Sequence, residues 1–212
     1  GIKVEKPSDD PVAAALARTA KARQVRAKQV KDLSDKAWDE LAAADSALGQ
    51  VTDIMLRIRD IAVHGATDTV SGSDREALAH EVDSLRSTII SLGNTQYEGQ
   101  YIFAGLQNNL APFDTTTGTF TGDTRLREVE VGTGLKLPTQ VSGADAFGAS
   151  AGTTSIFNTL DALTTALNTD DPNAVRLLLD DIDTTVKQAN QARTVAGTTQ
   201  EGFYQAGIAS QR

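Results

Sequence analysis

Hydrophobic residues between positions 38 and 63 recur at alternating steps of three and four. This is the spacing of the a and d positions of a coiled coil. The positions between them are mostly charged or polar, so the opposite side of this helix is predicted to face water. A helix of this kind packs a narrow apolar seam against other helices. The predicted seam residues are Leu41, Ala44, Leu48, Val51, Met55, Ile58 and Ala62.

A second helix is predicted after a polar turn over residues 65–72, which has a glycine near each end. Ser73 and Glu76 have the spacing of a capping box, in which each side chain accepts a hydrogen bond from the other residue's backbone N–H. Because the turn is short, the two helices are predicted to pack antiparallel. The apolar positions of the second helix are Leu78, Val82, Leu85, Ile89 and Leu92.

The chain begins with a less regular helical segment. Asp10 followed by Pro11 predicts a helix start, because aspartate caps helix N-termini and proline suits the first helical position. The segment continues to about Lys36, but basic residues interrupt its apolar seam. Two explanations remain open. Either this is an edge helix with one side in water, or its partners are cut-off terminal helices or neighbouring subunits.

Between residues 96 and 150 the pattern changes to short alternations with frequent glycine and threonine, and six of the ten aromatic residues lie there. These are strand and turn signals. Helical patterns resume near Ser155 and again after Asp171 and Pro172. The predicted fold is therefore mainly α with a β-rich insertion (α+β). Residues 1–95 and 151–212 form an elongated antiparallel helical bundle or coiled-coil rod, and residues 96–150 form the small β domain.

Composition excludes several kinds of partner. Acidic residues outnumber basic ones by 28 to 20, giving a net charge of -8. Phosphate binding needs clustered positive charge, so neither nucleic acid nor an anionic membrane is an expected partner. The chain contains no cysteine, which excludes disulfides and thiolate metal sites. No apolar run is long enough to predict a membrane span. The chain opens abruptly at Gly1 and stops at Arg212 within a helical pattern, so we expect both ends to be cuts in a longer chain.

Candidate chemical sites are weak. Residues 148–152 match the G-x-S-x-G pattern of a nucleophile turn, but no buried strand precedes them and no histidine follows. The loop over residues 114–123 lacks the dense acidic ligands of a calcium site. His64 and His80 lie on different predicted helices, with no second ligand at metal spacing. We therefore expect no catalytic residue, no cofactor and no metal, and a protein that is not an enzyme.

Several stretches resemble a known family. Residues 7–11 (Pro-Ser-Asp-Asp-Pro), followed by heptad helices, are similar to the start of flagellin-type proteins of bacterial flagella. Residues 100–105 (Gln-Tyr-Ile-Phe-Ala-Gly), followed by Pro112 and Phe113, resemble the Y-[IL]-F-A-G…P-F stretch of the hook-associated protein 3 family, which forms the junction between hook and filament. Shorter similarities to that family lie at residues 120–123, 129–132 and 143–147.

This resemblance implies a structural subunit of the bacterial flagellum. Such a subunit joins hook to filament as a junction or adaptor layer and forms that layer by self-polymerisation. The implied partners are other copies of itself, hook-side and filament-side flagellar proteins, and an export chaperone that binds a terminal segment missing from this chain. The implied location is extracellular, reached by flagellar type III secretion without a cleavable signal peptide.

We expect subunit contacts at Ser8, Asp9, Asp10, Arg57 and Arg59, with ordinary solvent exposure as the competing explanation for each. Two other functions remain open. A filament flagellin shares the helical pattern but would lack the F-A-G…P-F stretch. From a different class, the insertion is a glycan-binding or host-binding module on an extracellular stalk.

Residues 1–212 alone are expected to be a soluble monomer, because the terminal helices that complete the polymerising surface are missing. Light scattering of the purified chain should give the mass of one copy. A stable ring formed by these residues alone would contradict the expectation.

Overall fold

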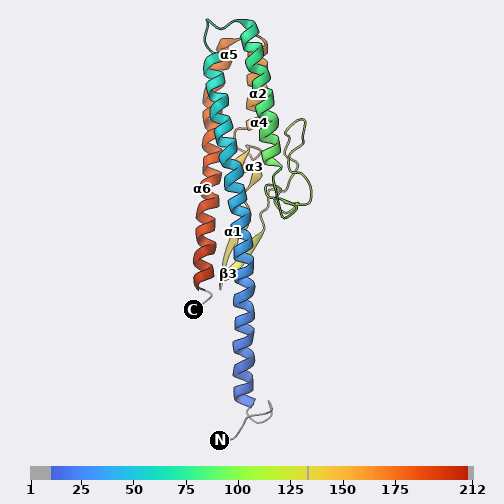
Figure 1. The fold of residues 1–212 in the computed structure, drawn as a ribbon, viewed down its shortest axis with the longest axis vertical. Helices are drawn as coiled ribbons and strands as arrows, with labels where there is room; N and C mark the ends of the chain where they lie inside the picture. Colours follow the sequence, from blue (N-terminus) through green and yellow to red (C-terminus); the bar gives the residue numbers. More distant parts are fainter. Residues whose placement is uncertain (1–10, 133, 210–212) are drawn as a thin grey trace.

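The computed structural model describes residues 11–132 and 134–209, so Ser8, Asp9 and Asp10 lie outside the described residues. The longest described element is α1 (Pro11–Gly65), a helix of 55 residues that runs most of the length of the molecule (Figure 1). At about 1.5 Å per residue it is about 80 Å long. The two helical segments predicted on either side of Ala37 are continuous, because alanine is a strong helix former and no glycine or proline lies near it.

α2 (Gly72–Gly93) runs antiparallel to the upper part of α1, as predicted (Figure 1). Its N-cap is Ser71, so the capping box predicted at Ser73 and Glu76 is wrong by two residues. Ser71 has the extended backbone that a cap requires. Its Oγ accepts a hydrogen bond from the backbone N–H of Asp74 at 3.2 Å and donates one to the Asp74 carboxylate at 2.6 Å.

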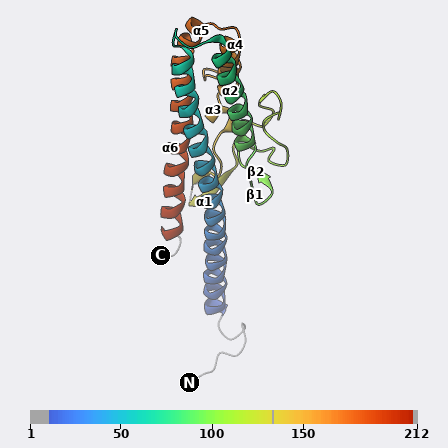
Figure 2. The ribbon, with the colours of Figure 1, turned by 45° about the horizontal axis from the view of Figure 1, so that its top comes forward.

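The C-terminal part of the chain returns along the rod. Ser155 and Asp171 cap two of its helices by accepting hydrogen bonds from backbone N–H groups, which confirms both predicted helix starts. The predicted last helix is interrupted at Leu178, after which the chain runs antiparallel to α1 and beside it (Figures 1 and 2). The helices are α3 (Gly143–Ala146), α4 (Ile156–Asn168), α5 (Pro172–Leu177) and α6 (Leu179–Ala209).

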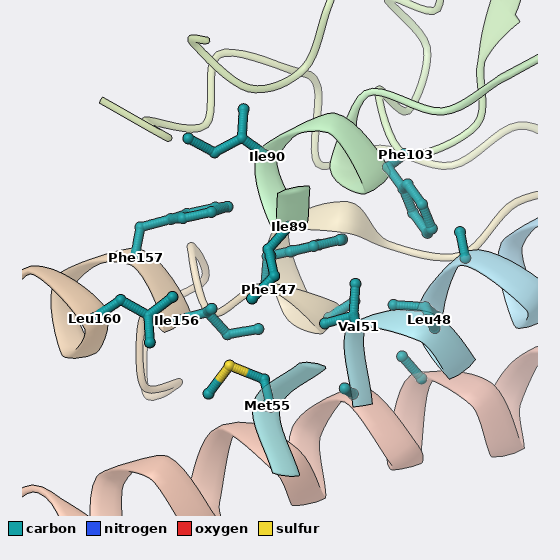
Figure 3. Close-up of a cluster of buried hydrophobic side chains, with 14 of the residues drawn as sticks. Leu48, Val51, Met55, Ile89, Ile90, Phe103, Phe147, Ile156, Phe157 and Leu160 are labelled. Carbon is teal, nitrogen blue, oxygen red and sulfur yellow. The ribbon is translucent and has the colours of Figure 1, made fainter. Parts of the chain in front are cut away.

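The seam predicted from the sequence forms the centre of the core. All seven predicted seam residues of α1 are at most 1% exposed. They belong to a hydrophobic cluster that also contains side chains from α2, α4 and α6. In Figure 3, Met55 of α1 lies beside Ile156 and Leu160 of α4. The other long helices therefore assemble on the apolar side of α1.

The described region between α2 and α4 contains two small antiparallel sheets joined by turns. The second hairpin packs against α1 and α6, and it contains the strand predicted from the alternation at residues 126–131. The division of the chain into a rod and a separate β domain stays a prediction. The apolar side chains of both parts join the same hydrophobic cluster. The strands are β1 (Gln96–Tyr97), β2 (Gln100–Tyr101), β3 (Glu128–Gly132) and β4 (Leu135–Pro138).

Aromatic side chains attach this region to the helices. The rings of Phe103 and Phe113 lie 5.4 Å and 4.7 Å from the ring of Phe147, measured between centroids. Phe113 and Phe147 also contact Phe157 of α4. All four rings are buried. The F-A-G…P-F stretch therefore acts in folding and does not present its phenylalanines to solvent.

The backbone conformation at Gly105, in the same stretch, requires a glycine. Gly105 has a φ of +62°, a conformation that residues with side chains rarely adopt. A Cβ at this position would collide with the carbonyl oxygen of Asp123. The turn after Phe103 can therefore close only with glycine, because the following loop returns across it.

Replacing Leu48 by alanine is expected to lower the free energy of unfolding by about 2–5 kcal/mol, because the fully buried side chain leaves a cavity. The matched control is Leu177→Ala on α5, where the residue is 81% exposed and the change should stay within about 0.5 kcal/mol. Urea unfolding followed by circular dichroism measures both. Equal effects of the two substitutions would contradict the seam as the core.

Candidate assembly surface

The predicted interface arginines of α1 are engaged within the chain. The Arg57 guanidinium lies 2.9 Å from the carboxylate of Glu81 on α2. The Nε of Arg59 donates a hydrogen bond to Asp183 on α6 at 2.6 Å. These ion pairs connect α1 to the helices on both sides of it. A contact from either arginine to another subunit would compete with them.

The first part of α1 projects beyond the rest of the described molecule (Figures 1 and 2). α6 ends beside Val30, where Val30 and Ala209 line the same hollow. Residues 15–26 are exposed on every side of the helix, with Leu16 at 66% and Val25 at 50% exposure. An edge helix with one side in water does not describe this segment. Because isolated helices of this length are marginal in water, it is a surface that packing by another chain segment would stabilise.

An apolar hollow of about 330 Å³ lies at the lower end of the contact between α1 and α6. Trp38 of α1 and Tyr204 and Ile208 of α6 line it, and all three are exposed to solvent. The Oγ of Ser34 in the same wall is buried and has no hydrogen-bond partner among the described residues. Gathered apolar side chains of this kind mark contact surfaces. We call this hollow and residues 12–33 of α1 the candidate assembly surface.

A buried polar network fastens the β3–β4 hairpin to α1. Glu40 is 7% exposed, and its two carboxylate oxygens accept hydrogen bonds from Arg127 at 2.6 Å and from the Gln140 amide at 3.0 Å. Arg127 and Gln140 flank the hairpin on its two sides in the sequence. Burial raises the pKa of Glu40, and its attraction to Arg127 and the hydrogen bond from Gln140 only partly oppose this.

The opposite end of the rod is closed by a buried arginine. The Arg75 guanidinium donates hydrogen bonds to the backbone carbonyls of Gly65 at 2.8 Å and Thr67 at 2.7 Å, and it pairs with Asp170. It therefore joins the end of α1, the start of α2 and the turn after α4. Sequence reasoning missed this role, because Arg75 lies in a polar stretch that resembles an ordinary helix start.

The weak chemical candidates remain unremarkable in the structure. Residues 148–152 lie between α3 and α4, and His64 and His80 are exposed. Asp114 accepts hydrogen bonds from the backbone and hydroxyl of Thr117, which hold its pKa below the ordinary value.

In the described part of the chain, no three histidine or acidic side chains are placed to hold a metal ion. Among the described helices, none has both the length and the apolar character needed to cross a bilayer.

One known protein family matches the N-terminal half of the chain. Residues 1–108, whose described part spans α1, α2 and the first sheet, match the family described as the bacterial flagellin N-terminal helical region. The chain belongs to this flagellin family. α1, including its exposed first part, thus lies within the matched N-terminal helical region.

Two curated relatives are both named flagellar hook-associated protein 3. The Salmonella typhimurium protein is 34% identical over 123 residues, which are 58% of this chain and 39% of the relative. The Escherichia coli protein is 29% identical over 181 residues, which are 80% of this chain and 57% of the relative. The chain thus spans about two to three fifths of these relatives. The resemblance inferred from the F-A-G…P-F stretch is confirmed.

Solved structures share the fold. A candidate flagellar hook-associated protein from Vibrio parahaemolyticus gives a TM-score of 0.86 at 23% identity, covering 97% of this chain and 94% of that one. The flagellar junction protein FlgL from Legionella pneumophila gives 0.76 at 16%, covering 95% and 97%. Flagellin from Bacillus cereus gives 0.57 at 16%, covering 84% and 88%. The predicted mainly α rod with a small β-containing insertion is confirmed.

The raised pKa of Glu40 makes a pH-dependent prediction. The folded state binds this proton more tightly than the unfolded state, whose pKa lies near 4.5. The stability that Glu40 contributes is therefore present below that value and is lost as pH rises through the folded pKa. Glu40→Gln removes this dependence, so the variant should gain stability relative to the original chain between pH 4 and pH 7.

Urea unfolding across this pH range measures the difference between Glu40→Gln and the original chain. The matched control is Glu128→Gln on β3, an exposed glutamate at the same hairpin, and its stability should follow that of the original chain. A Glu40→Gln variant that loses relative stability as pH rises would contradict the assignment.

Proposed function

We propose that this chain is the body of a structural subunit that joins the flagellar hook to the filament. The rods pack side to side with copies of themselves to form a junction layer, through heterologous contacts that generate helical or ring assemblies. Different patches of one body contact hook-side proteins and filament-side proteins. The protein acts outside the cell, after chaperone-assisted export by flagellar type III secretion, and it has no catalytic role.

The observation that carries this proposal is the uncovered part of α1. The projecting part of α1 is exposed on every side and continues past an apolar hollow, so it is suited to contacts between subunits. Two relatives named hook-associated protein 3 support the junction as the place of assembly. The loops between β2 and β3 extend to the side of the rod, where they can adjust the fit to a neighbouring layer (Figure 1).

The proposed contact residues remain Ser8, Asp9, Asp10, Arg57 and Arg59. Arg57 is exposed and Arg59 is half-buried, and both are already paired within the chain. We therefore give more weight to the candidate assembly surface than to these side chains.

The two alternatives have less support. A filament flagellin is disfavoured because the chain contains the F-A-G…P-F stretch and because its fold is less similar to the Bacillus cereus flagellin structure. A glycan-binding insertion needs exposed aromatic rings. Phe103, Phe113 and Phe147 are instead buried in the core. Glycan binding that maps to residues 96–150 would favour this alternative.

Deletion of the gene separates the junction protein from a flagellin. The expected phenotype is non-motile cells whose hooks lack filaments in electron micrographs, with monomeric flagellin released into the medium. Expression of the deleted gene from a plasmid is the control and should restore filaments. Loss of the filament together with loss of secreted flagellin would favour a filament protein, and normal filaments would refute the proposal.

A further inference from the structure

The projecting part of α1 carries basic residues all around the helix, and three of them line one side of it. Arg18, Lys21, Val25 and Lys28 follow one another at steps of three, four and three, which places them on one side of the helix. All four are exposed, and in the part of the chain that the structure describes none of the three cations forms an ion pair. We call these four residues the basic stripe.

The net charge of the segment around this stripe is positive, whereas that of the rest of the chain is negative. Residues 12–31 contain six of the twenty basic side chains and none of the 28 acidic ones. The remaining residues therefore carry fourteen basic against 28 acidic side chains. The expectation that the chain has no clustered positive charge holds for its average composition but not for this segment. Every copy of the chain thus carries both a basic segment and an acidic remainder that could attract the basic segment of another copy.

Further along the same helix, a second group repeats the spacing. Asp53, Leu56, Asp60 and Val63 again follow at steps of three, four and three. Leu56 and Val63 are about half exposed, and both aspartates are exposed. Neither aspartate forms an ion pair with another described residue, but Asp60 attracts Arg59 and Asp53 attracts Arg193 at longer range. We call these four residues the acidic stripe.

The two stripes cannot meet within one molecule. They are separated by about 35 residues of a continuous helix, which is about 50 Å at 1.5 Å per residue. Charges this far apart are screened, because the Debye length at physiological ionic strength is about 8 Å. Each stripe can therefore be neutralised by the other only if the other belongs to a different molecule.

We propose that the basic stripe of one copy docks against the acidic stripe of a second copy. This inference rests on the proposed function, because it takes the partner to be a neighbouring subunit. Val25 then packs against Leu56. With the two helices parallel, Lys21 and Lys28 then lie one residue out of step with Asp53 and Asp60, about 1.5 Å along the axis, which is within reach of a lysine side chain. Exposed ion pairs are weak, so this contact acts together with others in the assembly and leaves the isolated chain monomeric in dilute solution.

Disulfide trapping tests this contact, because the chain has no cysteine of its own. Val25→Cys and Leu56→Cys variants are purified, mixed in equal amounts and oxidised. The expected result is an excess of the mixed dimer over both homodimers at low salt, decreasing as salt screens the charges. The matched control replaces Leu56→Cys by Leu177→Cys, an exposed leucine outside both stripes. Equal yields of mixed dimer from the two mixtures would overturn the proposal.

Charge exchange tests the ion pairs separately from folding. Adding K21E and K28E to the Val25→Cys variant should lower the mixed-dimer yield by up to about fivefold for each ion pair lost. Adding D53K and D60K to the Leu56→Cys partner should then restore it. A yield that does not recover when both partners carry exchanged charges would contradict the docking of these two stripes.

Two further outcomes would reject the inference. Binding to vesicles of phosphatidylglycerol and phosphatidylcholine that K21E/K28E abolishes, with no excess of mixed dimer, would assign the basic stripe to a membrane surface. A K21E/K28E chain that loses trapping but still builds filaments on hooks in cells would remove the contact from assembly while leaving the proposed function standing. Only the gene deletion tests the function itself, through normal filaments or through loss of secreted flagellin together with the filament.

Discussion

The contact between α1 and α6 is the interaction on which the rest of the structure depends. α6 presents small buried residues such as Ala189 and Ala196 to α1, with Phe203 near its end. Small side chains allow close approach of two helices, so a long contact forms without a thick core. Ion pairs at its edges, from Arg59 to Asp183 and from Arg193 to Asp45, fix the helices side by side. The result is an elongated body.

This geometry also leaves part of α1 uncovered by the other described helices. The described part of α6 ends beside Val30, whereas α1 continues for about five further turns. The uncovered helix carries large apolar residues and a strong excess of positive charge, while the body that it leaves is acidic. A rod with a basic end and an acidic body has complementary surfaces that only another molecule can bring together. The proposed assembly contact therefore lies on the part of α1 that the described part of α6 does not cover.

Periodicity in the sequence predicts the parts of this fold that depend on local spacing. The seven seam residues, the starts at Ser155 and Asp171, and the antiparallel helix pair follow from steps of three and four and from capping residues. The start of α2 was misplaced because Ser71 and Ser73 both precede an acidic residue by three positions, and only backbone conformation distinguishes them.

Contacts between distant segments could not be predicted in the same way. The hollow between Trp38 and Tyr204 and the network of Glu40 with Arg127 depend on which helices lie side by side. The order of hydrophobic and polar residues within one segment does not specify which other segment packs against it. The basic stripe was hidden for another reason, since net charge averages over the whole chain. Its three cations matter only because the structure leaves that part of α1 exposed.

Hydrogen exchange along α1 tests whether the uncovered part of this helix becomes buried between subunits. Exchange is measured on the isolated chain and on native hook–filament junctions. We predict that amides of residues 12–33 exchange rapidly in the isolated chain and become strongly protected on assembly, while those of the seam around Val51 are protected in both. Equal exchange of residues 12–33 in the two states would contradict it.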